Sequence, residues 1–521
     1  MRIILKTLAV ATAAIITTGH ASAEGTEIGG INYNLDAASG TARVTWAGKC
    51  YCAGDAYKGV INIPAKVAYE GKTYNVVGIE PYAFSQSKEL KSVSIARSVE
   101  SIGKYAFAAC YGLESVTFEG DASVKEIGGQ AFLLCKSLGS IEIPESVEKI
   151  GKYAFEMCES LKSVNFAPKA RLTLIDDYVF CHTGLTEFDI PESVTEINPV
   201  AFCSNPGITE ITLPKQITRL SEQNPFAYNT QVTRMSVEKG NKTYDSRKDC
   251  NAIIETATNT LVAGCKASTI PASVTAIGRS AFNHCTDLTD AALPATIRSI
   301  GKYAYLGCTG LRSFYFPSTM NVMADSVFWK ATELDSIVTM AQRPFAIDES
   351  DFEPTTYETA TLYVPAGTAT LYRSASAWSK FRNIVELNKF VVDGVTYEVG
   401  DDGKARVAPA SEGVDYEGTI IIPTEVVSGT RRFEVDGATD DAFVNQGKAV
   451  KVVWRKAGSG IETYNAYGQR GHIRIDGTDA EAKVYSTGGT LMTTTFKRVI
   501  PIEQGVYFVK IKDVTFKVIV D

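Results

Sequence analysis

Residues 98–118 read SVESIGKYAFAACYGLESVTF, and residues 146–166 repeat the pattern as SVEKIGKYAFEMCESLKSVNF. Both stretches carry a small residue and an aromatic, Ala106-Phe107 and Ala154-Phe155, five residues after an isoleucine. Such anchor aromatics recur in steps of 23, 25, 23, 25, 22, 24, 56, 23 and 23 residues, and self-similarity at this period indicates a repeat architecture. The anchors are Phe84, Phe107, Phe132, Phe155, Phe180, Phe202, Phe226, Phe282, Tyr305 and Phe328.

Each repeat also contains the pattern of one short strand. Apolar residues follow the anchor at positions +6, +9 and +11, as in Leu113, Val116 and Phe118. A single unit cannot bury this apolar face, but stacked units with parallel strands about 4.8 Å apart can. A glycine often follows the isoleucine that stands five residues before the anchor, as Gly103 and Gly151 do, which predicts a turn with positive φ. The sequence therefore predicts a repeat solenoid, and the 56-residue step predicts an insertion in one unit.

The residues at +8 and +10 flank the buried +9 residue, so they are expected to point outward from each strand. On stacked strands they would form two polar rows, rich in hydroxyls and acids, on one face of the solenoid. Such a face is either a binding surface, as in many repeat proteins, or simply a solvated sheet face. The candidate binding residues are Ser115, Thr117, Ser140, Glu142, Ser163, Asn165, Glu187, Asp189, Glu210, Thr212, Asp290, Ser313 and Tyr315.

A second, longer repeat organises the two ends of the solenoid. Residues 57–84 match residues 416–443 without a gap, with Tyr57 aligned to Tyr416 and Phe84 to Phe443. The predicted order is a signal peptide at 1–23, an N-terminal β capping module at 24–80 and the solenoid with its terminal cap at 81–387. A second β module that starts a short repeat follows at 388–456, and a β-sandwich domain at 457–521.

The first 23 residues have the order of a secretory signal peptide. Arg2 and Lys6 precede a short apolar stretch, and Ala21-Ser22-Ala23 forms a small-residue cleavage site. No stretch reaches 18 apolar residues, so we expect an exported chain without a transmembrane segment.

Composition argues against several classes of function. The net charge of −7 and the pI near 5.5 do not fit a nucleic-acid binder. Only four histidines are present, and His182, His284 and His472 are too scattered to predict a shared metal site. No phosphate-binding loop, nucleophile elbow or zinc-protease motif occurs, so we expect no catalytic residue, metal or cofactor.

The eleven cysteines follow the repeat register. Most occupy the position three residues after an anchor, or one residue after it as Cys181 and Cys203 do, where small buried side chains are expected. For these we favour free thiols over disulfides. Cys250 and Cys265 flank the insertion and are the one pair that we would test as a disulfide.

These repeats resemble the BspA-like leucine-rich repeat family of bacterial surface proteins. The resemblance rests on Ser98-Val99, Ile102-Gly103, Ala106-Phe107 and the same pattern in residues 146–164, and it covers residues 76–340 closely. Residues 357–387 resemble the terminal cap of that family. Residues 457–521 resemble the C-terminal sorting-type β-sandwich domain of secreted Bacteroidetes proteins.

The resemblance implies an adhesion or protein-binding scaffold at the cell surface, not an enzyme. Its partner would be a host matrix protein, a host cell or a bacterial surface protein. The alternative is a glycan-binding or glycan-degrading surface protein. Sugar platforms need coplanar Trp or Tyr side chains, whereas the chain has four Trp and Tyr315 is the only aromatic among the candidate residues. This favours protein binding.

Overall fold

A computed structural model describes residues 25–47, 57–187, 189–400, 402–410, 415–429, 431–439, 441–443, 450–455, 461–469, 472–476, 481–486, 490–497, 499–503, 505–511 and 514–520. The predicted signal peptide lies outside these residues. By its internal contacts the chain divides into two compact units, Met1–Thr195 and Glu196–Asp521. None of the described helices is long and apolar enough to cross a membrane.

The first unit begins with a small antiparallel sheet, in the region predicted as a capping module. Strand β1 (Thr26–Ile28) pairs with β2 (Ile31–Asp36), and β2 pairs with β3 (Thr41–Val44). Strands β5 (Lys66–Tyr69) and β6 (Lys72–Ile79) form a hairpin. Within this hairpin, β6 pairs in parallel with β3. Because β6 also pairs with the first short strand of the repeats, the opening sheet covers the end of the repeat stack.

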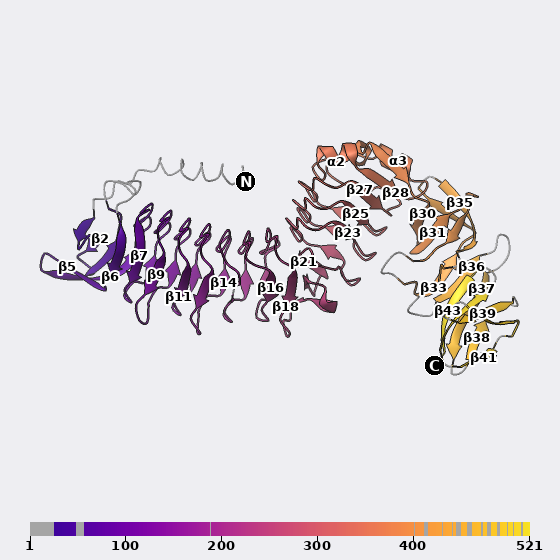
Figure 1. The fold of residues 1–521 in the computed structure, drawn as a ribbon, viewed down its shortest axis with the longest axis horizontal. Coiled ribbons are helices and arrows are strands. Elements are labelled where there is room, and N and C mark those ends of the chain that lie inside the picture. Colours follow the sequence, from indigo (N-terminus) through magenta and orange to yellow (C-terminus); the bar gives the residue numbers. More distant parts are fainter. Residues whose placement is uncertain are drawn as a thin grey trace. The chain divides into compact units, whose positions relative to one another are not determined.

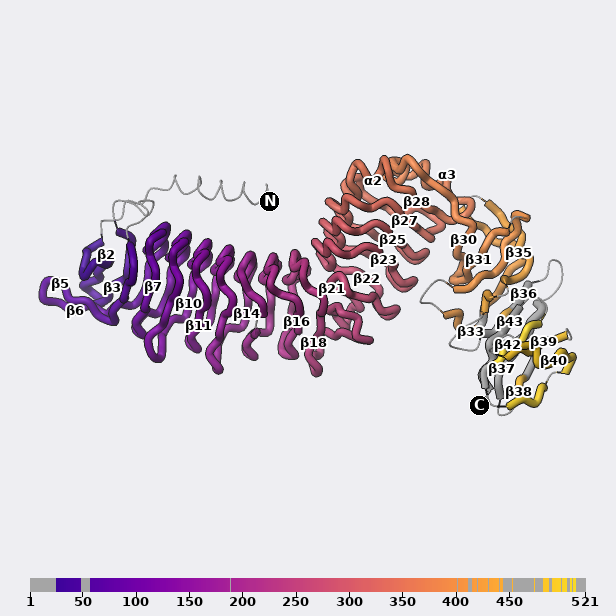
Figure 2. The backbone as a smooth tube through the Cα atoms, viewed as in Figure 1, coloured from indigo at the N-terminus to yellow at the C-terminus, as the bar shows by residue number. Residues whose placement is uncertain are grey.

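Successive turns of the first unit stack through two sets of parallel strands (Figures 1 and 2). The short set is β8 (Ser101–Ile102), β10 (Glu126–Ile127) and β12 (Lys149–Ile150), which pair in this order; β14 (Leu174–Ile175) follows at the same repeat position but belongs to a separate sheet. The long set is β4 (Gly59–Ile63), β7 (Leu90–Ile95), β9 (Ser115–Phe118), β11 (Ser140–Ile143) and β13 (Ser163–Phe166). The long strands correspond to the +8 to +11 positions of the repeat, so the predicted solenoid is confirmed.

The anchor aromatics form one continuous column inside the first unit. The rings of Phe84, Phe107, Phe132, Phe155 and Phe180 stack with centroid distances of 4.9, 5.0, 5.2 and 5.5 Å. All five side chains are at most 1% exposed. Because burial of one phenylalanine contributes about 2–3 kcal/mol, this column is a principal source of stability for the stack.

The glycine that follows the isoleucine of each repeat has a different role from the one predicted. Gly103, Gly128, Gly151 and Gly301 are absent from the described residues with positive φ. A Cβ atom at Gly151 would instead lie 2.5 Å from the main-chain nitrogen of Gly129 in the preceding turn. Gly103, Gly128 and Gly301 meet preceding main-chain atoms at 2.4–2.7 Å in the same way. The prediction of a positive-φ turn was therefore wrong, and the glycine permits close stacking of turns.

Positive φ occurs on both sides of the anchor, in residues that are mostly not glycine. Two residues before the anchor, Tyr105 and Tyr153 have φ of 59° and 61°. Two residues after it, Ala109 and Met157 both have φ of 59°. Bulky residues rarely adopt this conformation, so the stacked turns on either side must hold the backbone there.

The solenoid of the second unit begins with two short pairs and the predicted insertion. β15 (Glu196–Ile197) pairs with β17 (Arg219–Leu220), and β16 (Glu210–Leu213) pairs with β18 (Arg234–Val237). The insertion folds as an antiparallel meander that leads into new parallel rungs. Its strands are β19 (Tyr244–Asp245), β20 (Ala252–Glu255) and β21 (Thr260–Gly264), with η1 (Arg247–Asp249) between the first two, and the rungs are β22 (Ala276–Ile277), β24 (Ser299–Ile300) and β26 (Val322–Met323).

Five long strands and an aromatic cluster complete this solenoid. The cluster surrounds Trp378, whose indole Nε1 donates to the Phe345 carbonyl at 2.7 Å. Phe352, Tyr372 and Phe381 pack around the same ring, within the predicted terminal cap or close to it. The elements are β23 (Asp290–Ala292), β25 (Ser313–Phe316), β27 (Ser336–Thr339), β28 (Thr361–Val364), β29 (Asn383–Glu386), α2 (Pro354–Thr359), α3 (Ala369–Ser374) and η2 (Trp378–Lys380).

The match between residues 57–84 and residues 416–443 includes the hydrogen bonds of the aligned tyrosines, Tyr57 and Tyr416. The Tyr57 hydroxyl accepts from Asn32 N–H at 3.0 Å and donates to the Thr45 carbonyl at 2.8 Å. The Tyr416 hydroxyl accepts from Thr396 N–H at 3.0 Å and donates to the Ala408 carbonyl at 2.6 Å. The second module consists of β30 (Lys389–Val392), β31 (Val395–Val399), β32 (Ala405–Val407), β34 (Glu425–Ser428) and β35 (Arg431–Ala438).

The remaining strands form two further sheets that share one apolar core with the second module, from Phe390 to Ile511. One sheet contains β33 (Gly418–Ile422), β36 (Val450–Arg455), β37 (Ile461–Gln469), β38 (His472–Asp476) and β41 (Val499–Pro501). The other contains β40 (Leu491–Thr495), β39 (Ala482–Ser486), β42 (Gly505–Ile511) and β43 (Val514–Val520).

Candidate functional site

The long strands present alternate side chains to solvent, as predicted. In β11, Ser140 and Glu142 are exposed, whereas Ile141 and Ile143 are buried. The same alternation places Ser115 and Thr117 outward on β9 and Glu210 and Thr212 outward on β16. The other candidates on strands, all exposed or half-buried, are Ser163 and Asn165 on β13, Asp290 on β23, and Ser313 and Tyr315 on β25.

Two candidates fall outside this pattern. Glu187 and Asp189 are exposed, but they do not lie in a strand. Phe188 between them lies outside the described residues.

In the second unit, Asp290 accepts a hydrogen bond from the Ser313 hydroxyl, and the Thr212 and Ser236 hydroxyls lie 3.0 Å apart. In these two places the outward side chains already form hydrogen bonds with each other.

In the first unit, five of the candidates line one groove of about 750 Å³. This is within the range of ordinary ligand sites. The groove opens over β9 and β11, and its floor includes Val116 and Ile141, which are 5% and 2% exposed. The candidates in its lining are Ser115, Thr117, Ser140, Glu142 and Asn165.

The lengths of neighbouring loops explain this groove. Residues 119–125 connect β9 to β10 and residues 167–173 connect β13 to β14, so each connection has seven residues. The connection from β11 to β12 between them, residues 144–148, has only five. Gly120, Asp121 and Ala122 of the first long loop and Arg171 of the second line the groove. The shorter turn is thus recessed between two longer ones.

Charge in the groove differs from charge on the rest of the first unit. Elsewhere, lysines pair with acids one turn away, as in Lys91–Glu114 at 2.8 Å and Lys136–Glu159 at 2.7 Å. In contrast, Asp121, Glu142 and Glu145 form no ion pair with any described residue. The groove is therefore acidic.

The sequence reasoning missed three charged residues of this groove. Asp121, Glu145 and Arg171 lie in loops, outside the strand positions from which the candidates were selected. The signal for them was the anchor spacing: the two units with long loops have steps of 25 residues and the unit between them has 23.

The ladder cysteines are hydrogen-bond donors as well as small core residues. The thiols of Cys110, Cys135 and Cys158 donate to the carbonyls of Phe84, Phe107 and Phe132 at 3.0–3.1 Å. Together with Cys285 and Cys308 they are free, as favoured from the sequence. Burial raises the pKa of the Cys110 and Cys308 thiols to about 12, so these groups are unreactive.

Other cysteines depart from expectation. The disulfide considered between Cys250 and Cys265 is not formed, because both are free thiols. The Cys250 thiol donates to Ala252 O and the Cys265 thiol to Asn251 O. The free thiols favoured at Cys181 and Cys203 are also not found, since both cysteines are in the disulfide-bonded form.

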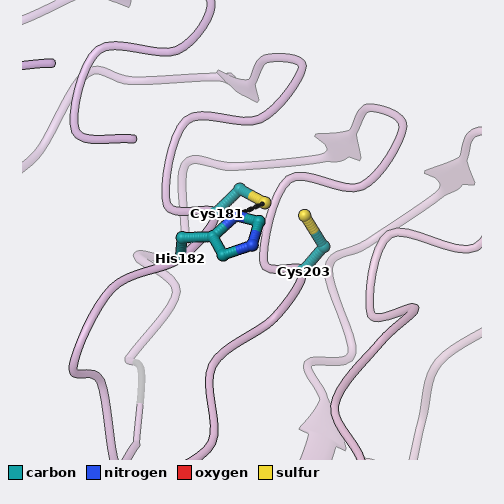
Figure 3. A group of neighbouring side chains, drawn as sticks. All are labelled: Cys181, His182 and Cys203. Carbon is teal, nitrogen blue, oxygen red and sulfur yellow. Dashed lines mark hydrogen bonds between the residues drawn. The ribbon is translucent and has the colours of Figure 1, made fainter. Parts of the chain in front are cut away.

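The two repeat histidines are half-buried. His182 lies beside Cys181, and its Nδ1 donates to the Cys181 Sγ at 3.2 Å because a bonded sulfur has no hydrogen (Figure 3). Burial lowers the pKa of His284 to about 4, so this ring is neutral at physiological pH. His472 begins β38.

A known family model matches the repeats of this chain. Residues 73–171, 169–262 and 253–380 match the BspA type leucine rich repeat region. A leucine rich cell surface protein from Faecalibacterium prausnitzii is 25% identical with a TM-score of 0.50, over 70% of this chain and 95% of that one. The pneumococcal vaccine antigen PcpA is 18% identical with a TM-score of 0.49, over 71% of this chain and 100% of that one.

A leucine-rich repeat protein from Bacteroides ovatus is 24% identical with a TM-score of 0.30, over 60% of this chain and 94% of that one. A comparison with curated proteins gave no match. The matched repeats cover more than half of the sequence, from residue 73 to residue 380. This chain therefore belongs to the BspA type leucine rich repeat family.

Proposed function

We propose that this chain is an exported surface scaffold that binds a protein partner through the outward face of its solenoid. The observation that carries the proposal is the acidic groove, since five residues selected for that face line it. The partner would be a host matrix protein, a host-cell protein or a protein on another bacterium. Family membership supports the general role of a protein-binding surface protein, without naming the partner.

The tyrosines of the repeat turns argue against a sugar platform at the start of the solenoid. The rings of Tyr82 and Tyr105 stack on each other, with centroids 4.9 Å apart and planes 14° apart. Tyr153 and Tyr178 stack in the same way at 4.7 Å. Sugars bind to the open faces of aromatic rings, and each of these contacts covers one face of both rings. We therefore rank protein binding above glycan binding and assign no catalytic residue.

Export would depend on residues 1–23, and residues 457–521 would serve as a sorting-type end domain. We would test this by expressing the full chain and a version that ends at residue 456 in a Bacteroidetes host. Loss of surface exposure in the shortened chain, with its solenoid still protease-resistant in cell extracts and the intact chain protease-accessible on cells, would support the sorting role. Equal exposure of both chains would refute it.

A binding screen tests the main proposal. The purified chain without residues 1–23 would be immobilised and exposed to matrix proteins, bacterial surface proteins and a glycan array. We expect saturable binding to at least one protein, weakened by lysine at Glu142 and Glu145. Saturable glycan binding without a protein partner would reverse the ranking. Protein binding that survives charge reversal at Glu142, Glu145, Glu187, Asp189 and Glu210 would remove this face from consideration.

A further inference from the structure

The two strands that border the groove lack the ladder that joins the other long strands of the first unit. Among the described residues, β9 pairs with β7 and β11 pairs with β13, but β9 and β11 do not pair with each other. Just before they begin, Gly139 N–H donates to the Glu114 carbonyl at 3.4 Å, whereas the corresponding bond from Glu114 N–H to the Lys91 carbonyl is 2.8 Å. The facing edges of β9 and β11 therefore have no ladder hydrogen bonds between them beyond this long bond at their start.

Open strand edges are templates for another extended chain, because their main-chain groups are arranged for sheet hydrogen bonds. The lining fits such an occupant. It includes the outward Ser115, Thr117 and Ser140 hydroxyls, together with Val116 and Ile141, whose side chains are buried. Alternate side chains of an extended segment would point toward the floor and toward solvent.

The charge of the groove selects the occupant. Asp121, Glu142 and Glu145 are exposed carboxylates without an ion-pair partner among the described residues. The one cation in the lining, Arg171, has its guanidinium 3.9 Å from the Glu148 carboxylate, which does not line the groove. Three unpaired negative charges around two open strand edges complement Lys or Arg side chains on an extended chain.

We infer that this groove binds an extended, Lys- or Arg-bearing segment of a protein partner, in part through main-chain hydrogen bonds to β9 and β11. The inference rests on the proposed function and specifies its partner. In this inference, Glu142 and Glu145 bind the basic side chains of the partner. The edges of β9 and β11 form hydrogen bonds with its main chain.

The test uses the chain without residues 1–23 and three labelled octapeptides, followed by fluorescence anisotropy. The first probe alternates Val and Lys, the second alternates Val and Glu, and the third alternates Pro and Lys. The third probe has the same charge as the first, but its proline residues have no main-chain N–H to donate. The groove variant is Glu142→Lys with Glu145→Lys. The matched control is Glu100→Lys with Glu192→Lys, which makes the same charge change at exposed residues of the first unit outside the groove.

We expect the Val-Lys probe to bind saturably and the Val-Glu probe not to bind. The groove variant should weaken the Val-Lys probe at least tenfold, the control variant less than twofold, and the Pro-Lys probe should bind at least tenfold more weakly. Equal losses in both variants, equal affinity of the Val-Lys and Pro-Lys probes, or no binding of the Val-Lys probe would each overturn the inference. If a protein found in the screen still binds the groove variant, the scaffold function survives and only the groove is excluded.

Discussion

Gly151→Ala provides the most direct test of how the turns stack. A Cβ atom there would lie 2.5 Å from Gly129 N and 2.8 Å from Gly129 Cα, both main-chain atoms of the preceding turn. The two turns are held together by the hydrogen bond from Gly151 N–H to the Ile127 carbonyl at 2.8 Å, so the added methyl cannot be relieved by a side-chain rotation. Overpacking typically costs about 1–3 kcal/mol, and we expect about 3 kcal/mol here.

Gly139→Ala is the matched control, in the turn before Gly151. A Cβ atom there would meet no atom within 4 Å, and Gly139 does not have positive φ. At such a site alanine restricts the unfolded chain and stabilises by about 0.4–1 kcal/mol. The two substitutions add the same methyl group, so their difference isolates the close approach of the main chain.

Hydrogen exchange is the suitable assay, because a chain with two units has no single unfolding transition. A loss of about 3 kcal/mol predicts exchange roughly 100-fold faster in peptides that cover β10 and β12. Peptides from the second unit should be unchanged. If Gly151→Ala exchanged as slowly as Gly139→Ala, the close-approach explanation would fail. Gly151→Asn separates the alternatives further, because asparagine tolerates positive φ and would be mild only if positive φ were the reason for glycine.

Three further predictions concern the first unit. Cys135→Ser should be tolerated because a hydroxyl can still donate to the Phe107 carbonyl, whereas Cys135→Val leaves that carbonyl with only its bond from Cys110 N–H and should cost about 0.5–1.5 kcal/mol, measured by hydrogen exchange of first-unit peptides. Glu114→Gln should change stability by less than about 0.5 kcal/mol at low salt, because its ion pair with Lys91 is exposed; a larger loss would show that the cross-turn pairs stabilise the stack. Burial raises the pKa of Glu156 from 4.5 to about 7, so the folded state holds this proton more tightly than the unfolded state. The stabilising contribution is complete below pH 4.5 and is lost as the pH rises through 7, so Glu156→Gln should reduce the loss of hydrogen-exchange protection of first-unit peptides between pH 5 and pH 8, after correction for intrinsic exchange rates, and an unchanged pH dependence would contradict the burial argument.

The sequence predicts the features that depend on periodicity. The buried column of Phe84 to Phe180 and the outward position of Ser140 and Glu142 follow from spacing alone, because strand alternation and stacking leave one solution. The Tyr57 and Tyr416 modules were also identifiable, since an ungapped match carries the same buried hydroxyl into the same hydrogen bonds.

The features missed from the sequence depend on comparing one turn with the next. The role of Gly151 is determined by the main chain of Gly129, 22 residues earlier, and no local propensity contains that distance. The groove likewise requires a five-residue loop between two seven-residue loops, and Asp121 and Arg171 face it only because those turns are stacked. Cys250 and Cys265 flank the insertion and are therefore the one pair to test as a disulfide, whereas in the structure each thiol has its own carbonyl acceptor.

The aromatic column passes the groove without a break, since Phe107 and Phe132 stack at 5.0 Å with planes 3° apart directly beside the unpaired strands. The outer sheet can therefore be interrupted while the core remains regular. The groove leaves the buried aromatic column intact and coincides with a two-residue difference in loop length. Shortening residues 119–125 or 167–173 by two residues should therefore make the groove shallower while the column stays stacked.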